Sequence, residues 1–479
     1  MKKSLKLLYI SLFFLFLWLP LLLMPFWRND SALEKRAPAP FPALITEEGV
    51  NLQFSDQYEN WLNGALPLRS RLLTVSNALR GELLGQETAN VAVGRDGWLF
   101  YASELPDALG LEPMDEAQLR SIAVTLSLLQ ERTEAGGGRF TFAPVPNKSS
   151  VYPEELPGRY RSVPVHDLDR LQALLPEYGV NCTDLLSVLG GAKEQGVYHR
   201  RDSHWNNRGA LLGANAILDS LSRPHEDHAD APFTEEEGWR GDLDKLLLPA
   251  GGVPDRQIVY DVEYRPFVFT QPRGVEDTAA QLASFMSDRE ERDMLFSTEN
   301  LELRDGSSLY MARDSFGRAL LPWMIDSYET TVFRRTDAPD LRTLALGTDV
   351  VFEIVERNLP RLLEKAPLVY APERHGLSAA GCPLGEELAV RLEEGAALRV
   401  CGGFPAGAEA GDGRVYLLLE GESRSLCLEA FPVYEQSLPG EGPGRGFSAC
   451  LSPELALTGS FRLTVLSGGI AYPCGELHF

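Results

Sequence analysis

The sequence predicts an α/β domain followed by a small antiparallel β-domain, both attached to an N-terminal membrane-spanning helix. Three observations lead to this prediction. Short apolar strands alternate with helical segments in the middle of the chain, alternating strands between Gly-rich turns follow residue 365, and the first 28 residues contain one long apolar run. With 479 residues and 44% hydrophobic composition, the chain is long enough for two or three domains with their own cores.

Residues 1–28 are predicted to be an uncleaved signal anchor. Three lysines precede an apolar run over residues 7–27, which at about 1.5 Å per residue can cross a bilayer core of about 30 Å. The run ends in bulky residues and has no small-x-small cleavage site. The positive-inside rule places the N-terminus in the cytoplasm and the rest of the chain outside the cell membrane. Residues 29–50, rich in Pro and Ala at their start, are predicted to be a stalk.

Charge and cysteine usage restrict the partners and the compartment. The net charge of −23, with no basic stripe, argues against nucleic acid and anionic surfaces as partners. Disulfides would suit an extracytoplasmic location, but five cysteines in the C-terminal part is an odd number, and no CxxC spacing predicts a metal site. Their pairing is left open for Cys382, Cys401, Cys427, Cys450 and Cys474, and Cys182 stands apart.

Residues 51–365 are predicted to form the α/β domain. Two amphipathic helices separated at Pro67 precede a hairpin, and the strands that follow are short and apolar without strict alternation, as in parallel strands covered on both faces. The hairpin is expected over residues 91–101 and the strands over 139–145, 179–186, 307–312, 330–335 and 349–355. Helices are expected over residues 54–84, 114–135, 208–221 and 318–328.

Two further regions carry less regular or different patterns. Residues 222–300 are acidic and are predicted to hold loops or an insertion that borders the site, and their HEDH sequence at 225–228 is interpreted as a solvated loop rather than a metal cluster. Residues 366–479 are predicted to form an antiparallel β-sandwich. Because all seven tryptophans precede it, a structural or docking role competes with sugar binding there.

Ser315 is the candidate nucleophile. In YMARDSFGRALLPWM an apolar strand ends and a helix begins, so the hydroxyl of Ser315 is expected above the carboxyl edge of the sheet, where α/β proteins bind ligands. The N–H groups of the first helical turn, including that of Ser315, can stabilise an oxyanion. The alternative is a helix N-cap, since Ser and Asp are both favoured there.

The stretch RDSHWNN supplies a candidate base. Asp202 and His204 are two residues apart, so in an extended loop their side chains leave the same face of the backbone. The carboxylate can orient the imidazole, which can then deprotonate Ser315. Asn206 or Asn207 is expected to cap the following helix. Together these residues indicate nucleophilic acyl transfer without a cofactor.

The motifs also carry a family resemblance over residues 54–365. DSHW, RDSFG, DVVFEIVERNL, GRDGWLFY and PVPNKSSVYPEELP together resemble the DHHW proteins and the alginate O-acetyltransferases of the AlgJ/AlgX kind. The resemblance implies an SGNH-hydrolase-like fold in which Ser315 accepts the acyl group, His204 is the general base and Asp202 orients it. The sequence differs from the family pattern at Arg313, where a Gly is usual, and at Ser203, the second position of the DHHW motif.

The resemblance also implies a function and partners. The expected function is O-acetylation of an exopolysaccharide or cell-wall glycan, with the acetyl group delivered across the membrane by a multi-spanning membrane-bound O-acyltransferase. An esterase that removes acetyl groups with the same triad is an alternative, and so is a non-catalytic scaffold of a polysaccharide export complex. The polymer, the acetylated hydroxyl, the immediate donor and the oligomeric state are left open.

Further candidates for the site come from the loops around it. Asn147 or Lys148 is expected to supply a second oxyanion contact, with a structural cap as the alternative for Asn147. Tyr152 and Trp205 are expected either to stack on a sugar or simply to pack within the protein. Glu356 and Arg357 are interpreted as an ion pair at the sheet edge rather than as contacts to substrate. The candidate substrate-binding and oxyanion residues are Asn147, Lys148, Arg313, Trp205 and Tyr152.

Overall fold

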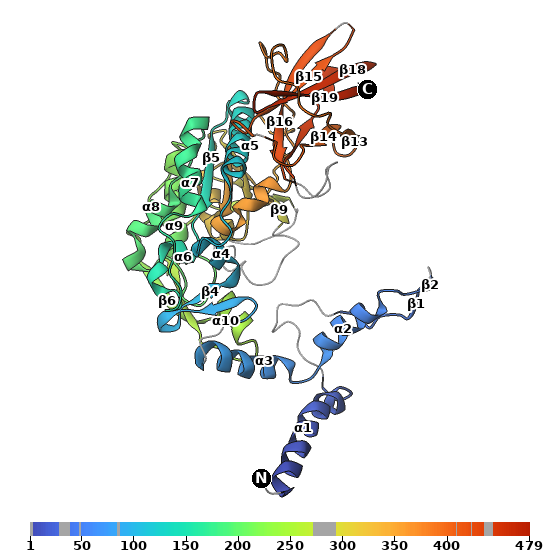
Figure 1. Cartoon of the computed structure of the whole chain (residues 1–479). Coiled ribbons are helices and arrows are strands. Elements are labelled where there is room, and N and C mark those ends of the chain that lie inside the picture. Colours follow the sequence, from blue (N-terminus) through green and yellow to red (C-terminus); the bar gives the residue numbers. More distant parts are fainter. Residues whose placement is uncertain are drawn as a thin grey trace.

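The structure, a computed structural model, places an N-terminal helix at one end of the molecule and the C-terminal β-domain at the other, with the α/β domain between them (Figure 1). The described residues are 3–27, 39–46, 49–83, 87–271, 294–408, 410–422, 424–434 and 444–479. Much of the predicted stalk, residues 29–38 and 47–48, therefore lies outside the described residues.

The N-terminal helix α1, Lys3–Leu23, contains the one candidate membrane span among the described residues. Its window Lys6–Leu23 has a mean hydropathy of 2.1, and its side chains are almost all exposed. Length and composition therefore allow it to cross a bilayer, although a signal sequence at the N-terminus has the same pattern.

The α/β domain is organised around a six-stranded sheet in the order β5-β12-β10-β11-β9-β8. The first four strands in this order are parallel, as predicted, whereas β9 and β8 add to the edge in antiparallel orientation. The predicted sheet is therefore corrected to a mixed one. The reason lies in the half-buried, alternating pattern of these two strands, which is typical of antiparallel edges. The bounds are β5 Phe140–Val145, β8 Phe267–Gln271, β9 Leu295–Asn300, β10 Ser308–Arg313, β11 Thr330–Arg335 and β12 Thr348–Val355.

The strand predicted over residues 179–186 is wrong. The chain makes a single parallel bridge there, between Phe142 of β5 and Cys182. Asp184 then caps α8, Leu185–Gly191, by accepting a hydrogen bond from the N–H of Ser187 at 3.0 Å. An N-cap two residues after the bridge turns the chain into a helix before a strand can extend.

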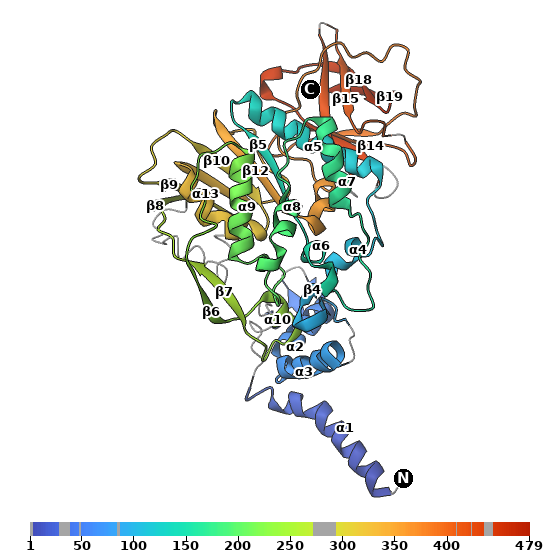
Figure 2. The same ribbon diagram turned by 90° about the vertical axis from the view of Figure 1, so that its left-hand side faces the viewer.

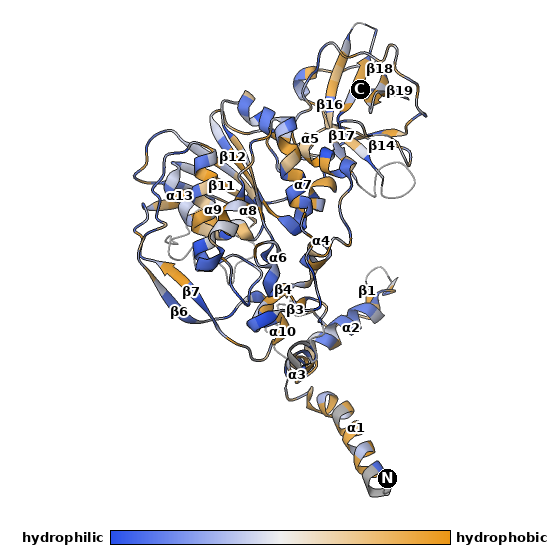
Figure 3. Ribbon diagram, turned by 60° about the vertical axis from the view of Figure 1, so that its left-hand side comes forward, coloured by the Kyte–Doolittle hydropathy of each residue, from blue (hydrophilic) through white to orange (hydrophobic). Residues whose placement is uncertain are grey.

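Helices cover both faces of the sheet, and successive residues of each central strand pack to opposite sides (Figure 2). On β10, Leu309 and Met311 join a core with α8, α9 and α13, while Tyr310 and Ala312 join a core with α5 and α7. Figure 3 shows that hydrophobic and hydrophilic residues alternate along the helices that cover the sheet. The bounds are α5 Glu116–Ala135, α7 Asp167–Leu174, α9 Asn207–Ser220 and α13 Leu321–Ser327.

Smaller elements lie at the end of the domain nearest α1. The predicted hairpin is present as β3 and β4, and α3 docks on α10, where Asn77 Nδ2 donates to the Leu247 carbonyl at 3.0 Å. A second hairpin, β6–β7, flanks α10. The bounds are β1 Ile45–Thr46, β2 Gly49–Val50, α2 Phe54–Ala65, α3 Arg69–Ala78, β3 Val91–Val93, β4 Leu99–Tyr101, α4 Leu105–Ala108, α6 Lys148–Val151, β6 Phe233–Trp239, α10 Asp242–Leu247 and β7 Asp255–Tyr260.

The C-terminal domain is antiparallel, as predicted, but its seven described strands form one hydrogen-bonded order, β13-β14-β17-β16-β15-β18-β19. The predicted sandwich, with two separate sheets, is therefore wrong. Strand β16 pairs with β15 along 425–430 and with β17 along 431–433. One long strand thus joins both halves into a nearly closed sheet. The bounds are β13 Val390–Glu393, β14 Arg399–Gly403, β15 Val415–Glu420, β16 Ser425–Val433, β17 Gly446–Cys450, β18 Ser460–Ser467 and β19 Ile470–His478.

This domain is fixed to the α/β domain through α5. Arg374 bridges Glu131 on α5 and the fully buried Glu429 on β16, at 2.5 Å and 2.6 Å. Phe431 enters the same core as α5. The sequence left the pairing of the cysteines open. In the structure all six are free thiols, and no two of them form a disulfide.

Candidate active site

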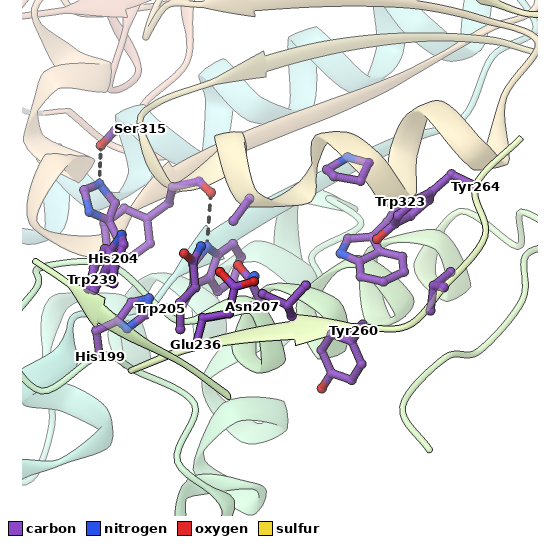
Figure 4. A pocket seen from close by; sticks show the side chains of 16 residues that line it. His199, His204, Trp205, Asn207, Glu236, Trp239, Tyr260, Tyr264, Ser315 and Trp323 are labelled. Carbon is purple, nitrogen blue, oxygen red and sulfur yellow. Dashed lines mark hydrogen bonds between the residues drawn. The ribbon is translucent and has the colours of Figure 1, made fainter. Parts of the chain in front are cut away.

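Ser315 lies between the end of β10 and the 3₁₀ helix η8, Phe316–Leu320, at the carboxyl edge of the parallel strands. It occupies the N-cap position, but the neighbouring Asp314 does the capping, because its Oδ1 accepts from the N–H of Phe316 at 2.8 Å. The hydroxyl of Ser315 lies instead 2.9 Å from Nε2 of His204 (Figure 4). The strand-to-helix junction therefore directs the serine toward an imidazole.

The Asp-x-His loop holds the other two groups as the spacing predicts. His204 Nδ1 lies 2.7 Å from Asp202 Oδ1, and the same carboxylate oxygen accepts from the backbone N–H of His204 at 2.9 Å. Asn206 caps α9 by accepting from the N–H of Gly209, which ends the loop. Although burial alone raises the pKa of Asp202, its contacts with His204 lower that pKa below the ordinary value, so the carboxylate is ionised.

Two residues brace this loop from below and from the side. Lys148 is fully buried, and its ammonium donates to the carbonyls of His199, Arg200 and Asp202, the last at 2.6 Å. Burial lowers the pKa of Lys148 to about 8. On the other side, the N–H of Asp242 on α10 donates to Asp202 Oδ2 at 2.6 Å. The loop is thus held in place by hydrogen bonds from the Lys148 ammonium to its carbonyls and from the Asp242 N–H to its carboxylate.

Asp242 also places a second carboxylate beside the imidazole. Its Oδ1 accepts from the N–H of Ser203 and its Oδ2 from the hydroxyl of Ser203, both at 2.7 Å. Oδ2 lies 3.8 Å from His204 Nδ1. The family position at which this chain has Ser203 therefore anchors an acidic residue from a distant helix.

A cleft of about 390 Å³ opens beside the serine. In Figure 4, His204 and Ser315 lie at one end of the cleft, and Trp323 and Tyr264 lie at the other. One wall comes from the β6–β7 hairpin and the segment after it, and the opposite wall comes from η8 and α13. The lining residues used below are His199, Glu236, Trp239, Gln257, Tyr260 and Tyr264.

Of the five candidate substrate-binding residues, the structure brings only Trp205 to this cleft. Its ring is 98% buried in the wall, and its indole N–H donates to the Phe316 carbonyl at 3.1 Å. The other four are buried elsewhere: Lys148 lies under the loop, and Tyr152 donates its hydroxyl to the Lys193 carbonyl at 2.9 Å. Both are engaged with backbone carbonyls, which accounts for their orientation away from the cleft.

Arg313 and Asn147 also point into the protein. The guanidinium of Arg313 is fully buried and donates to the Asp314 carbonyl at 3.0 Å. Gly317 makes room for it, since a Cβ at that residue would lie 2.7 Å from the Arg313 Cβ. Asn147 joins β5 to η9, because its Oδ1 accepts from the N–H of Arg357 at 3.2 Å and its N–H donates to Glu356 Oε2 at 2.6 Å. Asn147 occupies the N-cap position of α6 but makes no side-chain cap hydrogen bond there, so its side chain serves to link α6 to η9.

The pair Glu356–Arg357 is not an ion pair. Glu356 Oε1 lies 3.4 Å from Nδ1 of His166, and its other oxygen accepts from Asn147 and from the hydroxyl of Ser150. Arg357 lies over the ring of Phe316, with its guanidinium 5.2 Å from the ring centre. Adjacent residues of η9, Glu356–Leu363, therefore point to opposite sides, one toward a buried cluster and one toward the residue after Ser315.

Two groups of carboxylates and imidazoles are close enough to share a metal ion among the described residues. One consists of the Asp202–His204 pair and Asp242, whose atoms are already connected by the hydrogen bonds above. The other consists of Asp107, His166 and Glu356. In it, burial raises the pKa of Asp107 to about 7, with the nearby Glu356 adding to the rise.

Sequence reasoning missed the cleft residues contributed by the β6–β7 hairpin. Trp239 and Glu236 come from β6, and Tyr260 and Gln257 come from β7. Residues 222–300 were predicted to border the site, and the described part of that region does so. The signal available was the spacing of aromatic residues in an otherwise acidic stretch, but it does not indicate which side of a strand they occupy.

The segment that contains the Asp-x-His loop is similar to a known protein family. Residues 91–289 match the family model of the SGNH hydrolase-like domain of the acetyltransferase AlgX. The resemblance to the AlgJ/AlgX-like family is confirmed. The matched segment includes Asp202 and His204 and ends before Ser315.

Curated relatives are similar to this chain over part of their length. A probable alginate O-acetylase AlgJ from Pseudomonas putida is 29% identical over 206 residues, which is 41% of this chain and 52% of the relative. The protein of the same name from Pseudomonas aeruginosa is 28% identical over 223 residues, which is 43% of this chain and 54% of the relative. The chain thus spans about half the length of the curated relatives it matches.

Solved structures are similar at low identity. The O-acetyltransferase domain of Pseudomonas putida AlgJ is 21% identical with a TM-score of 0.38, and the match covers 58% of this chain and 94% of that one. A DHHW family protein from Eubacterium siraeum is 20% identical with a TM-score of 0.43, covering 57% and 93%.

Proposed function

We propose that this protein is a membrane-anchored, extracytoplasmic O-acetyltransferase that moves acetyl groups onto glycan hydroxyls through an acyl-Ser315 intermediate. The observation that carries the proposal is the chain of contacts from Asp202 Oδ1 to His204 Nδ1 at 2.7 Å and from His204 Nε2 to the Ser315 hydroxyl at 2.9 Å. The family match and the relatives named as alginate O-acetylases support the reaction type. In this proposal residues 51–365 are the catalytic domain and residues 366–479 an accessory domain.

The proposed reaction has two halves. His204 takes the proton of Ser315 as its oxygen attacks the carbonyl carbon of an acetyl ester, and the protonated imidazole then gives that proton to the departing alkoxide. In the second half a sugar hydroxyl gives its proton to His204 and attacks the acyl-serine. The proton returns to Ser315 as the acetylated sugar leaves. Asp202 stabilises the imidazolium in both halves.

The position of the site supports a donor at the membrane. The β6–β7 hairpin, which lines the cleft, and α10 lie on the side of the α/β domain that faces α3 and α1, whereas the C-terminal sheet lies on the far side (Figures 1 and 2). In this proposal a multi-spanning membrane-bound O-acyltransferase delivers the acetyl group to Ser315. The C-terminal sheet, docked on α5, is then directed away from the membrane.

The proposal is tested by trapping the intermediate. The full-length protein in detergent is mixed with an activated acetyl ester, quenched in acid and analysed by peptide mass spectrometry. We expect acetylation of the peptide that contains Ser315 in the parent and none in Ser315→Ala. Equal acetylation of the two proteins would contradict the proposal, and so would the absence of any acylation in the parent.

A second measurement separates transfer from hydrolysis, which use the same triad. With a glycan acceptor present, the amounts of acetylated sugar and of free acetate are compared at equal consumption of the ester. A transferase increases acetylated sugar at the expense of acetate as acceptor is added. An esterase releases the same acetate at every acceptor concentration.

A further inference from the structure

The walls of the cleft beside Ser315 have a composition that restricts the acceptor, provided that the proposed function holds. Aromatic rings and neutral amides supply most of the lining. Among the residues that the structure describes, no Lys or Arg lines the cleft, and Glu236 is its single carboxylate. A sugar that enters from solvent therefore meets ring faces and amide groups before it reaches the serine.

The rings occur along the whole cleft. At the catalytic end, Trp239 stacks on His199 with ring centres 4.0 Å apart and planes 26° apart. At the far end, the Trp323 ring lies 5.2 Å from Tyr264 and 6.1 Å from Tyr260. Trp239 and the two tyrosines are half-buried, so part of each ring remains accessible. Apolar ring faces of this kind pack against the C–H faces of pyranose rings.

The charge of the cleft disfavours an acidic acceptor. A polyuronate carries one carboxylate on each sugar, and proteins commonly bind carboxylates through Arg forks or Lys. Glu236 would instead repel such a chain, and the net charge of −23 adds a repulsive field. Arg208 lies beside Tyr260, but its guanidinium packs 4.9 Å over the Phe233 ring and donates to the Gln195 carbonyl.

We propose that the acceptor is an uncharged glycan, whose pyranose rings stack on the aromatic residues of this cleft, and not a polyuronate such as alginate. Gln257 then supplies a neutral hydrogen-bonding group to its hydroxyls, whereas the amide of Asn207 already donates to the Ile258 carbonyl. The substrate implied by the names of the curated relatives is thus not carried over to this chain, because the groups that would recognise a uronate carboxylate are missing from the described lining.

The test compares acceptors on the full-length protein in detergent, with p-nitrophenyl acetate as the donor. Cello- and chito-oligosaccharides serve as neutral acceptors, and a mannuronate oligosaccharide of equal length serves as the acidic one. We expect the better neutral acceptor to be acetylated at least about tenfold faster than the uronate. Equal or faster acetylation of the uronate, or no acetylation of either neutral oligosaccharide, would overturn the inference.

The two proposals fail in distinguishable ways, because acylation of Ser315 by the donor is measured in the same samples without any acceptor. A protein that is not acylated contradicts the proposed function. A protein that is acylated and prefers the uronate retains the proposed function and contradicts the acceptor class.

A pair of charge variants tests whether the cleft itself sets the preference. Glu236 lines the cleft, whereas the next residue of β6, Glu237, points to the other face of the hairpin and pairs with Arg256. Glu236→Lys should raise transfer to the mannuronate oligosaccharide by about tenfold, and Glu237→Lys, with the same change in net charge, should keep the preference of the parent. Equal effects of the two variants would contradict recognition in the cleft.

An aromatic variant gives a second, independent readout. Trp239→Ala removes a ring at the catalytic end of the cleft, and we expect it to raise KM for the neutral oligosaccharide by about tenfold. Tyr416→Ala is the matched control, because Tyr416 is a half-buried aromatic residue of the C-terminal sheet. An unchanged KM in Trp239→Ala would count against stacking.

Discussion

The α/β domain contains two groups in which a serine, a histidine and a carboxylate meet, and they are arranged differently. At the cleft, Nε2 of His204 lies 2.9 Å from the Ser315 hydroxyl, while Nδ1 lies 2.7 Å from Asp202 and 3.3 Å from the Ser203 hydroxyl. In the buried group, Nδ1 of His166 faces both the Ser150 hydroxyl at 3.1 Å and Glu356 at 3.4 Å. Its Nε2 lies 3.1 Å from the Ser162 hydroxyl but also 2.9 Å from the Val163 carbonyl, which has no counterpart at Nε2 of His204.

This difference decides which histidine can act as a base. A carbonyl only accepts, so Nε2 of His166 carries a proton, and Glu356 favours a proton on Nδ1 as well. Burial alone would lower the pKa of His166, but its contacts with Glu356 raise that pKa to about 9. Ser150 donates to Glu356 at 2.6 Å rather than to the imidazole. The comparison shows that the partner of each ring nitrogen matters more than the residue types present.

The largest expected effect comes from exchanging each histidine for glutamine. His204→Gln removes the group that takes the Ser315 proton in the proposed reaction, so acylation by an activated ester should fall by about 10³- to 10⁴-fold. His166→Gln is the matched control, because His166 is held in a structural cluster, and it should acylate close to the parent rate. Burst kinetics with a chromogenic acetate ester measure both. An equal loss of acylation rate in the two variants would show that His204 and His166 do not differ in their effect on acylation.

The buried group should be visible in the pH dependence of stability. The pKa of His166 is raised to about 9 from an ordinary value near 6.5, so between these values the folded state holds a proton that the unfolded chain has lost. Stability from this group is therefore complete below about pH 6.5 and disappears as the pH rises through about 9. We expect the free energy of unfolding to fall by about 1–3 kcal/mol over this range.

Urea unfolding of the full-length protein at a series of pH values checks this expectation. His166→Gln should be less stable than the parent at neutral pH and should show a shallower fall toward pH 9. If the parent and the variant decrease equally, then the ionisation of His166 contributes no stability, and other groups account for the slope.

Much of the fold and part of the site could be predicted from the sequence. The strand at 330–335 and the junction at Ser315 follow from apolar runs that end at turn and cap residues, which are local signals. The Asp-x-His spacing likewise fixes two side chains on one face. The β6 strand escaped prediction because its sequence, FTEEEGW, is exposed and acidic and has neither strand nor helix periodicity. Its strand conformation depends on pairing with β7.

The direction of a side chain was harder to predict than its position. Lys148 begins α6 just after β5, but its ammonium donates to carbonyls of the Asp-x-His loop and does not reach the cleft. Asp242 was not singled out, because its effect depends on α10 lying against the Asp-x-His loop, a contact between segments 40 residues apart. Contacts of this kind between distant segments leave no local pattern in the sequence.

Substitution of Asp242 is expected to have a smaller effect on the acylation rate than substitution of His204. It tests whether a second carboxylate near His204 distinguishes the group at the cleft from the buried group. Its carboxylate lies 3.8 Å from Nδ1 of His204 and is hydrogen-bonded to Ser203, so we expect it to position the loop and to stabilise the positive charge that the imidazole gains when it takes the serine proton. Asp242→Asn should lower the acylation rate, measured by burst kinetics with the chromogenic acetate ester, by about tenfold.

Ser203→Ala separates the two parts of this prediction, since it removes a hydroxyl that donates to Asp242 at 2.7 Å and lies 3.3 Å from Nδ1 of His204, without removing a charge. It should reduce the acylation rate less than Asp242→Asn does. If the two variants reduce the rate equally, then Asp242 only braces the loop. The group at the cleft and the buried group would then differ in how the histidine is oriented, and the second carboxylate would have no electrostatic part in the difference.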